Sequence, residues 1–589
     1  MTLWERNKYF HQTSFQNGEF MDININNYFF KLLFPARVST QSLLKVIMPV
    51  HHSVSVRRSA LATVFLAGLS AFPQAQSRVP DRTIIYLDPQ EHTNLYPPAG
   101  GFYPNGGILS QITDRLTWQD PETLEIRPWL ATDWSVNADS TIYTFHLRSG
   151  VTFSDGTPLD AQAVALNFQT YGKGNQALHF PVSEAISNFD HAEVTSPTTV
   201  IFHFTHPAPG FLQATSVLGS GIVSPATLGR PFDDLGTATG IIGSGPFVVS
   251  ADIPGREVDL VARQDYRWGP KAEEGRATVD RIKILVVPED SIRVGALLAG
   301  QADIIRQVEA YDEEQIRRAR YRLFAPSTRG VNTGLAFRPD NPLVADIRVR
   351  KALLHGTDRQ EIVSVLYSRD YPVARSILSS QAAGYADFSQ KLKYDPALAA
   401  SLLDSAGWKM GEDGLRHRNG QTLRLGIHVS LPHPQNKTML ELIAQQWRRL
   451  GVQLDIMSGA AAGVLLDNLT PQRTPLTVSE VGRADPDVLK SEFFPRNRDS
   501  LLQKGGQSTK VRAFRDETLD TMLLDIASIT NREERLRRVV AVQEYLIDNA
   551  YDIPLFEEPQ VYAASPDLKG LRFEAVGRPV LRDLEFAAP

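Results

Sequence analysis

The sequence predicts a protein of the α/β class, in which strands and helices follow one another along the chain. In the first half, short stretches alternate between apolar and polar residues, which is typical of strands with one buried face. From about Arg348 onward, apolar residues recur at helical spacing, and short strands separate the helical stretches. Of the chain's residues, 42% are hydrophobic and 22% charged, which is typical of a folded globular protein. The length of 589 residues predicts about three or four domains or one large multi-lobed body.

The first half is predicted to consist mainly of strands joined by turns. We expect a strand at 83–87, and a surface loop at 89–107 because that segment is rich in Pro, Gly and Asn. A strand at 141–147 leads to a turn at 154–158, and helical spacing then predicts a helix at 159–168. Further strands are expected at 199–204, 246–249, 258–261 and 282–287.

The second half is predicted to be mainly helical. Gly407 and Gly451 follow helical stretches and are typical signals for a helix C-terminus. Short strands are expected at 423–429 and 452–456. The expected helices are 348–354, 360–366, 396–406, 437–450 and 533–549.

The charge balance and the absence of cysteine exclude several classes of function. The 61 basic and 66 acidic residues give a net charge of -5, which offers no general attraction to nucleic acid. A chain without cysteine has no disulfide, no thiolate metal site and no lipid-modified cysteine anchor. We therefore expect no nucleic-acid partner and no lipid anchor.

The common sequence motifs of enzymes are missing. There is no G-x-S-x-G nucleophile motif, no H-E-x-x-H zinc motif and no phosphate-binding P-loop. The glycines at 240, 243 and 245 lack the dinucleotide-binding spacing and precede Pro246, so they indicate a turn before a strand. We predict that the protein is not an enzyme and has neither a cofactor nor a metal site. The alternative, a hydrolase, would need a nucleophile or metal cluster that the sequence does not show.

The N-terminal region has the pattern of a secretory signal. Arg57 and Arg58 precede an apolar run at 59–72, and small and polar residues follow at 73–76. The run is too short to span a bilayer, and a buried helix, the alternative, would not explain the basic flank. Since 47 residues precede Met48, we interpret residues 1–47 as an upstream extension and residues 48–76 as the signal peptide. The product is expected to be exported to the periplasm.

A series of short motifs follows the signal in a defined order. The series begins with WLATDW at 129–134 and YTFHLRSGVTFSDGTP at 143–158. It continues with GSGPF at 243–247, DYRWG at 265–269, GQAD at 300–303, DIRVRKAL at 346–353 and IPL at 553–555. Together these motifs closely resemble the signature of family 5 extracytoplasmic solute-binding proteins, the receptors of ABC importers for oligopeptides, dipeptides and nickel chelates.

The resemblance implies a type II, cluster C-like periplasmic-binding-protein fold with two lobes, hinge strands between them and an additional inserted subdomain. A solute would be enclosed where the lobes close. The implied partners are a small-molecule ligand and the permease subunits of an ABC importer at the inner membrane, and we expect a monomer. The implied lobe I comprises residues 77–118, 240–325 and 556–589, the inserted subdomain residues 119–239, and lobe II residues 326–555.

The resemblance also points to the ligand class, through an Asp-Pro element at 485–486. Peptide-binding members commonly place an Asp four residues before the Pro, where it pairs with the peptide's ammonium group, but this chain has Gly482 there. Nickel-binding members tend to have His after the Asp-Pro, and this chain has Asp487. The neighbouring Arg483 would favour carboxylates. We therefore expect a small anionic metal chelate, a metallophore or a nickel complex, and keep a short peptide as the alternative.

Six residues are candidates for ligand binding. Tyr96 is carried over from Asn94–Pro97, which resembles an early motif of the nickel-binding members. Arg483 could instead pair internally with Asp485 or Asp487, and Arg329 in the expected hinge strand is a second candidate for an anion. For Phe180 and His433, packing and surface positions are the alternatives. The expected ligand-binding residues are Tyr96, Phe180, Arg329, His433, Arg483 and Asp487.

Overall fold

The computed structural model describes residues 82–101, 103–186, 188–270, 275–429, 435–458, 473–494 and 516–587. All of these residues belong to one compact unit. The predicted upstream extension and signal peptide lie outside the described residues, and so does His433.

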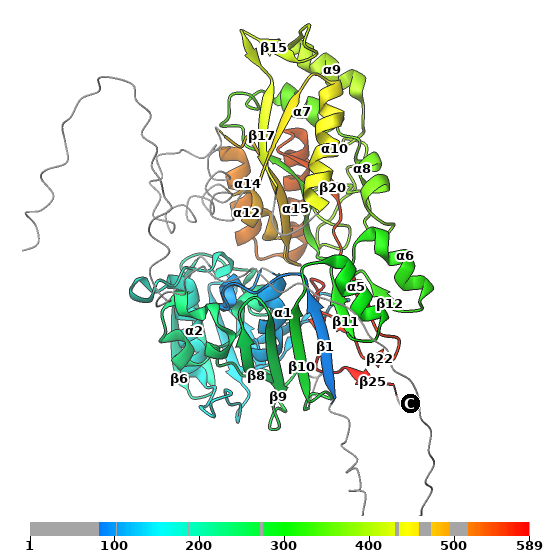
Figure 1. The fold of residues 1–589 in the computed structure, drawn as a ribbon. Coiled ribbons are helices and arrows are strands. Elements are labelled where there is room, and N and C mark those ends of the chain that lie inside the picture. The colour runs from blue at the N-terminus through cyan, green and yellow to red at the C-terminus, as the bar shows by residue number, and fades with distance from the viewer. Residues whose placement is uncertain are drawn as a thin grey trace, which may run out of the picture. The chain divides into compact units, whose positions relative to one another are not determined.

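A seven-stranded sheet forms the centre of lobe I (Figure 1). Its strand β1 (Thr83–Asp88) is parallel to both neighbours, β10 (Arg281–Val286) and β11 (Ile304–Arg306). Helices α5 (Asp290–Leu298) and α6 (Ala310–Arg318) pack against this sheet through a shared apolar cluster. The remaining strands, each antiparallel to its neighbour, are β8 (Phe247–Ile253), β9 (Glu257–Ala262), β12 (Arg322–Phe324) and β21 (Tyr562–Ala564).

A four-stranded antiparallel sheet forms the centre of the inserted subdomain, with helix α2 (Ala161–Lys173) packed against it. Its strands, in spatial order, are β4 (Ala131–Val136), β5 (Ile142–Leu147), β7 (Thr199–Phe204) and β6 (Phe189–Ser196). The shorter elements of this half are α1 (Tyr103–Ile112), α3 (Phe211–Ala214), α4 (Pro225–Leu228), the paired strands β2 (Thr117–Gln119) and β3 (Ile126–Pro128), and 3-10 turns at Pro97–Ala99, Gln176–Leu178, Glu184–Ile186, Leu218–Ser220, Phe232–Gly236 and Ala238–Gly240.

Lobe II is built around a three-stranded antiparallel sheet, in which β13 (Gly330–Phe337) lies between β19 (Leu476–Gly482) and β20 (Asp552–Phe556). A separate parallel pair joins β17 (Arg424–His428) to β18 (Gln453–Met457). The helices are α7 (Ile347–His355), α8 (Arg359–Leu366), α9 (Pro396–Ser405), α10 (Gln435–Arg449), α12 (Val488–Phe493), α14 (Glu517–Ser528) and α15 (Arg532–Asp548). The small strands are β14 (Lys409–Met410), β15 (Arg416–Arg418) and β16 (Gln421–Thr422).

The end of the chain returns to lobe I as two short antiparallel pairs. Strand β22 (Leu568–Lys569) pairs with β25 (Glu585–Phe586), and β23 (Arg572–Phe573) pairs with β24 (Pro579–Val580). We call residues 572–580 the C-terminal hairpin. Its tip contributes to the candidate site described below.

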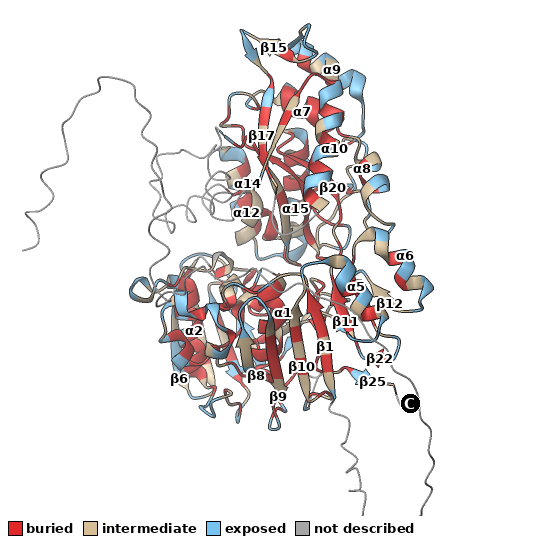
Figure 2. Cartoon of the chain, in the orientation of Figure 1, coloured by how far each residue is buried: buried red, intermediate tan, exposed pale blue. Residues whose placement is uncertain are grey.

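The lobes have separate hydrophobic cores. The lobe I and subdomain core includes residues from 84 to 304 and from 562 to 584, whereas the lobe II core includes residues from 331 to 556. Figure 2 shows the buried residues concentrated on the sheets and on the inward faces of the helices. The two-lobed α/β arrangement predicted from the sequence is therefore present, and the residue boundaries given for the lobes stay a prediction.

Most of the predicted elements are observed with boundaries shifted by one or two residues. The predicted loop at 89–107 is wrong at its end, because α1 begins at Tyr103. Tertiary contacts stabilise this helix despite its glycines. The Asn105 amide donates to the Asn94 carbonyl at 2.8 Å, and a Cβ atom at Gly106 would collide with the Arg578 side chain. The composition that predicted a loop thus serves close packing against the C-terminal hairpin.

The glycine-rich segment before β8 also serves close packing. The Gly245 amide donates to the Ile112 carbonyl at 2.9 Å. A Cβ atom at Gly245 would lie 2.7 Å from the Thr113 backbone nitrogen, so only glycine fits this approach to the end of α1. The sequence predicts a turn before a strand here, and the structure shows that the glycines of this turn allow a close approach to α1.

The first residues of α2 allow a direct test of the local sequence signal. Helix α2 begins at Ala161, two positions later than predicted, because Asp160 is its N-cap and accepts a hydrogen bond from the Ala163 amide at 2.9 Å. We expect Asp160→Ala to lower the free energy of unfolding by about 1 kcal/mol, since an unsatisfied helix N-terminus remains. Urea unfolding would measure the change. Asp160→Ser, which keeps the cap, should behave like the wild type, and equal losses in both variants would contradict the cap's role.

Candidate functional site

The candidate site lies where β13 begins and β19 ends. The antiparallel register places Gly330 opposite Gly482, and the Arg483 amide donates to the Arg329 carbonyl at 2.7 Å. Gly330 has a φ angle of +140°, and a Cβ atom there would overlap the Val481 carbonyl. The close strand pairing thus brings together the backbones of Arg329 and Arg483, the two arginines predicted to bind an anion.

A cavity of about 210 Å³ opens beside the end of β19. Its walls come from lobe I and the inserted subdomain on one side and from residues 481–484 of lobe II on the other. The charged side chains in the walls are Arg115, Arg483, Arg578 and Glu574. Three arginines and one glutamate therefore line the cavity, and this charge balance favours a negatively charged occupant.

Arg115 and Glu574 form an ion pair in the lobe I wall. The Arg115 guanidinium also donates to the Ser216 carbonyl at 3.0 Å and lies 4.9 Å from the centre of the Trp129 ring. The preceding residue, Asp114, accepts hydrogen bonds from the Tyr266 hydroxyl at 2.8 Å and the Trp268 indole at 2.9 Å. Burial raises the pKa of the Asp114 carboxyl above its ordinary value. The DYRWG motif therefore anchors the segment that bears Arg115.

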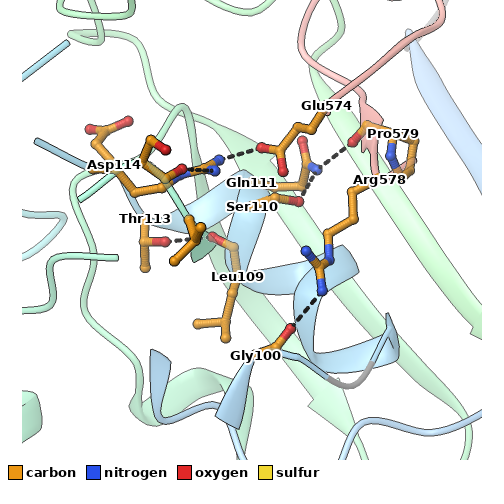
Figure 3. Close-up of polar contacts among 12 residues, drawn as sticks. Gly100, Leu109, Ser110, Gln111, Thr113, Asp114, Glu574, Arg578 and Pro579 are labelled. Atoms are coloured by element: carbon orange, nitrogen blue, oxygen red, sulfur yellow. Dashed lines mark hydrogen bonds and ion pairs between the residues drawn. The ribbon is translucent and has the colours of Figure 1, made fainter. Parts of the chain in front are cut away.

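The C-terminal hairpin forms another part of the lobe I wall. Figure 3 shows Glu574, Arg578 and Pro579 of the hairpin next to Gln111 and Gly100. The Gln111 amide donates to the Pro579 carbonyl at 3.2 Å, and the Arg578 guanidinium donates to the Gly100 carbonyl at 3.1 Å. The hairpin is thus attached to helix α1 and to the loop before it.

A second, smaller cavity of about 50 Å³ adjoins the first and shares Arg483 with it. Asp485 and Asp487 line this cavity. Both carboxylates pair with Arg535, at 3.4 Å for Asp485 and 2.6 Å for Asp487. Burial raises the pKa of Asp485, and the negative charge of Asp487 raises it further. Arg535 is therefore an ion-pair partner of both carboxylates, whereas the sequence suggests only Arg483 as their partner.

The other predicted site residues within the described ranges do not line these cavities. Tyr96 and Phe180 are buried in the hydrophobic core with their ring centres 4.9 Å apart, and the Tyr96 hydroxyl donates to the Pro181 carbonyl at 3.3 Å. The half-buried Arg329 side chain donates to the Gln381 amide oxygen at 3.4 Å, and burial lowers the pKa of its guanidinium. Arg483 and Asp487 are the predicted residues that line a described cavity, and His433 is outside the described residues.

Sequence reasoning missed Arg115, Glu574 and Arg578. Arg115 and Glu574 are 459 positions apart in the sequence, so no local pattern links them. One signal was available, since Arg115 immediately follows Asp114, the acceptor for the Tyr266 and Trp268 side chains of a recognised motif. Arg578 lies in a short segment near the C-terminus that no motif covers.

A comparison with models of protein families identifies the family of this chain. Residues 125–490 match the model for bacterial extracellular solute-binding proteins, family 5 Middle. The chain belongs to this family. The match covers more than half of the sequence and extends from the inserted subdomain into lobe II.

Individual relatives agree with this family 5 assignment. Heme-binding protein A from Haemophilus influenzae is 26% identical over 495 residues, which cover 78% of this family 5 protein and 84% of the relative. NikA from Brucella suis, solved in complex with Fe(III)-EDTA, has a TM-score of 0.70 at 22% identity. The aligned region covers 85% of this chain and 99% of the NikA chain. The dipeptide binding protein from Pseudoalteromonas sp. SM9913, solved with Met-Leu, has a TM-score of 0.72 at 19% identity. The aligned region covers 86% of this chain and 100% of the dipeptide binding protein. The two solved structures share the fold.

These findings describe a family of binding proteins. Heme-binding protein A and the dipeptide binding protein are named for binding and not for catalysis. Within the described ranges of this family 5 protein, no three His, Asp or Glu side chains gather into a group that could hold a metal ion. In the same ranges, no helix has the length and apolar character needed to cross a membrane.

Proposed function

We propose that this solute-binding protein is the periplasmic substrate-binding component of an ABC importer, and that it encloses a small anionic metal chelate between its lobes. The observation that supports this proposal is the 210 Å³ cavity with three arginines and one glutamate in its walls. Guanidinium groups bind carboxylates through paired, charge-assisted hydrogen bonds. A chelate whose carboxylates surround a metal ion presents such groups on its surface.

Residue 482 favours the chelate over a free peptide. Gly482 lines the cavity next to Arg483, where an acidic side chain would be needed to pair with a peptide ammonium group. Asp485 and Asp487, which follow in the chain, are held by Arg535, and Glu574 of the cavity wall is held by Arg115. Binding of a peptide ammonium group by any of these three carboxylates would require it to leave its arginine.

The proposal can be tested with two probes that differ in charge. Calorimetric titration with Fe(III)-EDTA, an anion, and with the zwitterionic dipeptide Met-Leu should show tighter binding of the anion. Native mass spectrometry of protein purified from its own cells should show a retained solute with carboxylate groups. Tighter binding of Met-Leu, or a retained peptide, would instead establish the peptide alternative, and no binding of Fe(III)-EDTA would refute an anionic chelate site.

Arg483 gives the proposal a specific mutational test. We expect Arg483→Ala to weaken Fe(III)-EDTA binding by about 1.5 to 3 kcal/mol, or about tenfold to a hundredfold, because a hydrogen bond to a charged group is lost. Arg424→Ala is the matched control, since Arg424 is an exposed arginine of the same lobe that pairs with Asp455 at 3.1 Å. Equal affinity of the Arg483→Ala and Arg424→Ala variants would remove Arg483 from the site.

A further inference from the structure

Arg578 is a buried arginine in the wall of the same cavity. Its exposed fraction is 6%. The Nη2 atom donates to the Gly100 and Gly101 carbonyls, each at 3.1 Å. Its guanidinium lies 5.1 Å from the centre of the Tyr103 ring, and its Nε atom is buried without a hydrogen-bond partner. Within the described residues, Arg578 thus has carbonyl and aromatic contacts but no carboxylate partner.

Other buried arginines of lobe I each have a carboxylate. Arg115 pairs with Glu574, Arg306 with Asp88 and Arg293 with Asp290. A buried charge without a partner costs several kcal/mol, and proteins normally pair it. An arginine that lacks this partner and lines a cavity is suited to receive the negative charge from a ligand.

Two arginines of lobe II, the buried Arg350 and the half-buried Arg359, show how carbonyl groups alone can satisfy a guanidinium. Arg350 and Arg359 each donate to three backbone carbonyls through two of their nitrogen atoms. Neither residue lines a described cavity. Arg578 differs on both points, because its two carbonyl contacts share one nitrogen atom and its side chain lines the largest described cavity.

The hairpin holds Arg578 in position and keeps Glu574 from pairing with it. The Glu574 amide donates to the Arg578 carbonyl at 2.8 Å, and the Gly577 amide donates to the Glu574 carbonyl at 2.9 Å. The two side chains extend in different directions from this turn (Figure 3), and Glu574 pairs with Arg115. A guanidinium held in place before the ligand arrives loses little conformational freedom on binding.

We propose that Arg578 binds a carboxylate of the solute from the lobe I side of the cavity, while Arg483 binds a second one from lobe II. The solute is then a molecule with at least two carboxylate groups that bridges the lobes. This inference rests on the proposed function and adds two details to it. The solute has at least two carboxylate groups, and Arg578 binds one of them.

The test compares three variants with the wild type, with Fe(III)-EDTA as the probe. Arg578→Gln keeps an amide that can donate to the Gly100 carbonyl but removes the charge, and Arg578→Lys keeps the charge. Arg572→Gln is the control, because Arg572 lies in the same hairpin, is more exposed and lines no described cavity. Affinity is measured by calorimetry, and thermal unfolding of the ligand-free proteins reports any damage to the fold.

We expect Arg578→Gln to lower the affinity about tenfold to a hundredfold, Arg578→Lys to retain most of it, and Arg572→Gln to match the wild type, all with similar unfolding temperatures. Wild-type affinity in Arg578→Gln would overturn the inference and leave the proposed function standing. Equal losses in the Gln and Lys variants, or a loss that accompanies a lower unfolding temperature, would indicate a structural role and also overturn it. A wild type that does not bind Fe(III)-EDTA would overturn the proposed function itself.

Discussion

Replacing Asp88 by alanine is expected to lower the free energy of unfolding by about 3 to 5 kcal/mol, because the change leaves a buried guanidinium without its carboxylate. Asp88 and Arg306 are both about 3% exposed and form two hydrogen bonds of 2.8 Å. Asp88 also accepts from the Tyr86 hydroxyl at 3.2 Å. Urea unfolding of wild type and variant would measure the loss.

An exposed ion pair supplies the control for this experiment. Glu314 and Arg318 pair at 2.8 Å on the surface of α6, with exposed fractions of 62% and 78% for their side chains. Glu314→Ala should leave the free energy of unfolding nearly unchanged, because water solvates the remaining charge. If Asp88→Ala and Glu314→Ala lowered the free energy of unfolding equally, the buried Asp88–Arg306 pair would contribute no more to stability than an exposed pair, and the prediction would be wrong.

The position of this ion pair connects stability with the site. The Arg306 guanidinium lies 5.7 Å from the centre of the Tyr103 ring, and the Arg578 guanidinium lies 5.1 Å from the same ring. The Tyr103 hydroxyl donates to the Val576 carbonyl of the C-terminal hairpin at 2.6 Å. The Asp88–Arg306 pair therefore supports the ring on which the cavity wall packs.

Asp552 is expected to make the protein less stable as the pH rises from about 4 to about 7. Burial raises the pKa of this carboxyl from 3.8 to about 7, although a hydrogen bond from Ser479 at 2.8 Å opposes the change. Its other oxygen is buried without a partner. The folded state thus retains a proton that the unfolded state releases above about pH 4, and deprotonation favours unfolding until the folded state also loses the proton near pH 7. This difference between the pKa values of the unfolded and folded states corresponds to about 4 kcal/mol in the free energy of unfolding.

Asp552→Asn isolates this contribution from those of other acids. The asparagine oxygen can accept the Ser479 hydrogen bond and its amide does not titrate, so the variant should match the wild type near pH 4 and be about 4 kcal/mol more stable near pH 8. Urea unfolding across this pH range would show the difference. The control is Asp233→Asn, at a residue with an 80% exposed side chain. A pH-independent difference between Asp552→Asn and the wild type would contradict the prediction.

The secondary structure could largely be predicted from the sequence because its signals are local. Alternation at 199–204 predicts β7 with its exact boundaries, and Pro396 marks the start of α9. The predicted helix 437–450 corresponds to α10, which begins two residues earlier. The start of α1 could not be predicted, because contacts from Asn105 and Arg578 stabilise a helix in a segment whose composition favours a loop.

The sequence by itself determined the α/β class, most strands and helices, and membership of the solute-binding family, since periodicity, caps and motif order are properties of neighbouring residues. The tertiary structure alone decided that Arg535 holds Asp485 and Asp487, that Tyr96 and Phe180 are buried together, and that Arg578 lines the cavity beside Arg483. These contacts join residues far apart along the chain. Their geometry depends on how the sheets, strands β13 and β19, and the C-terminal hairpin pack, and no local pattern encodes that packing.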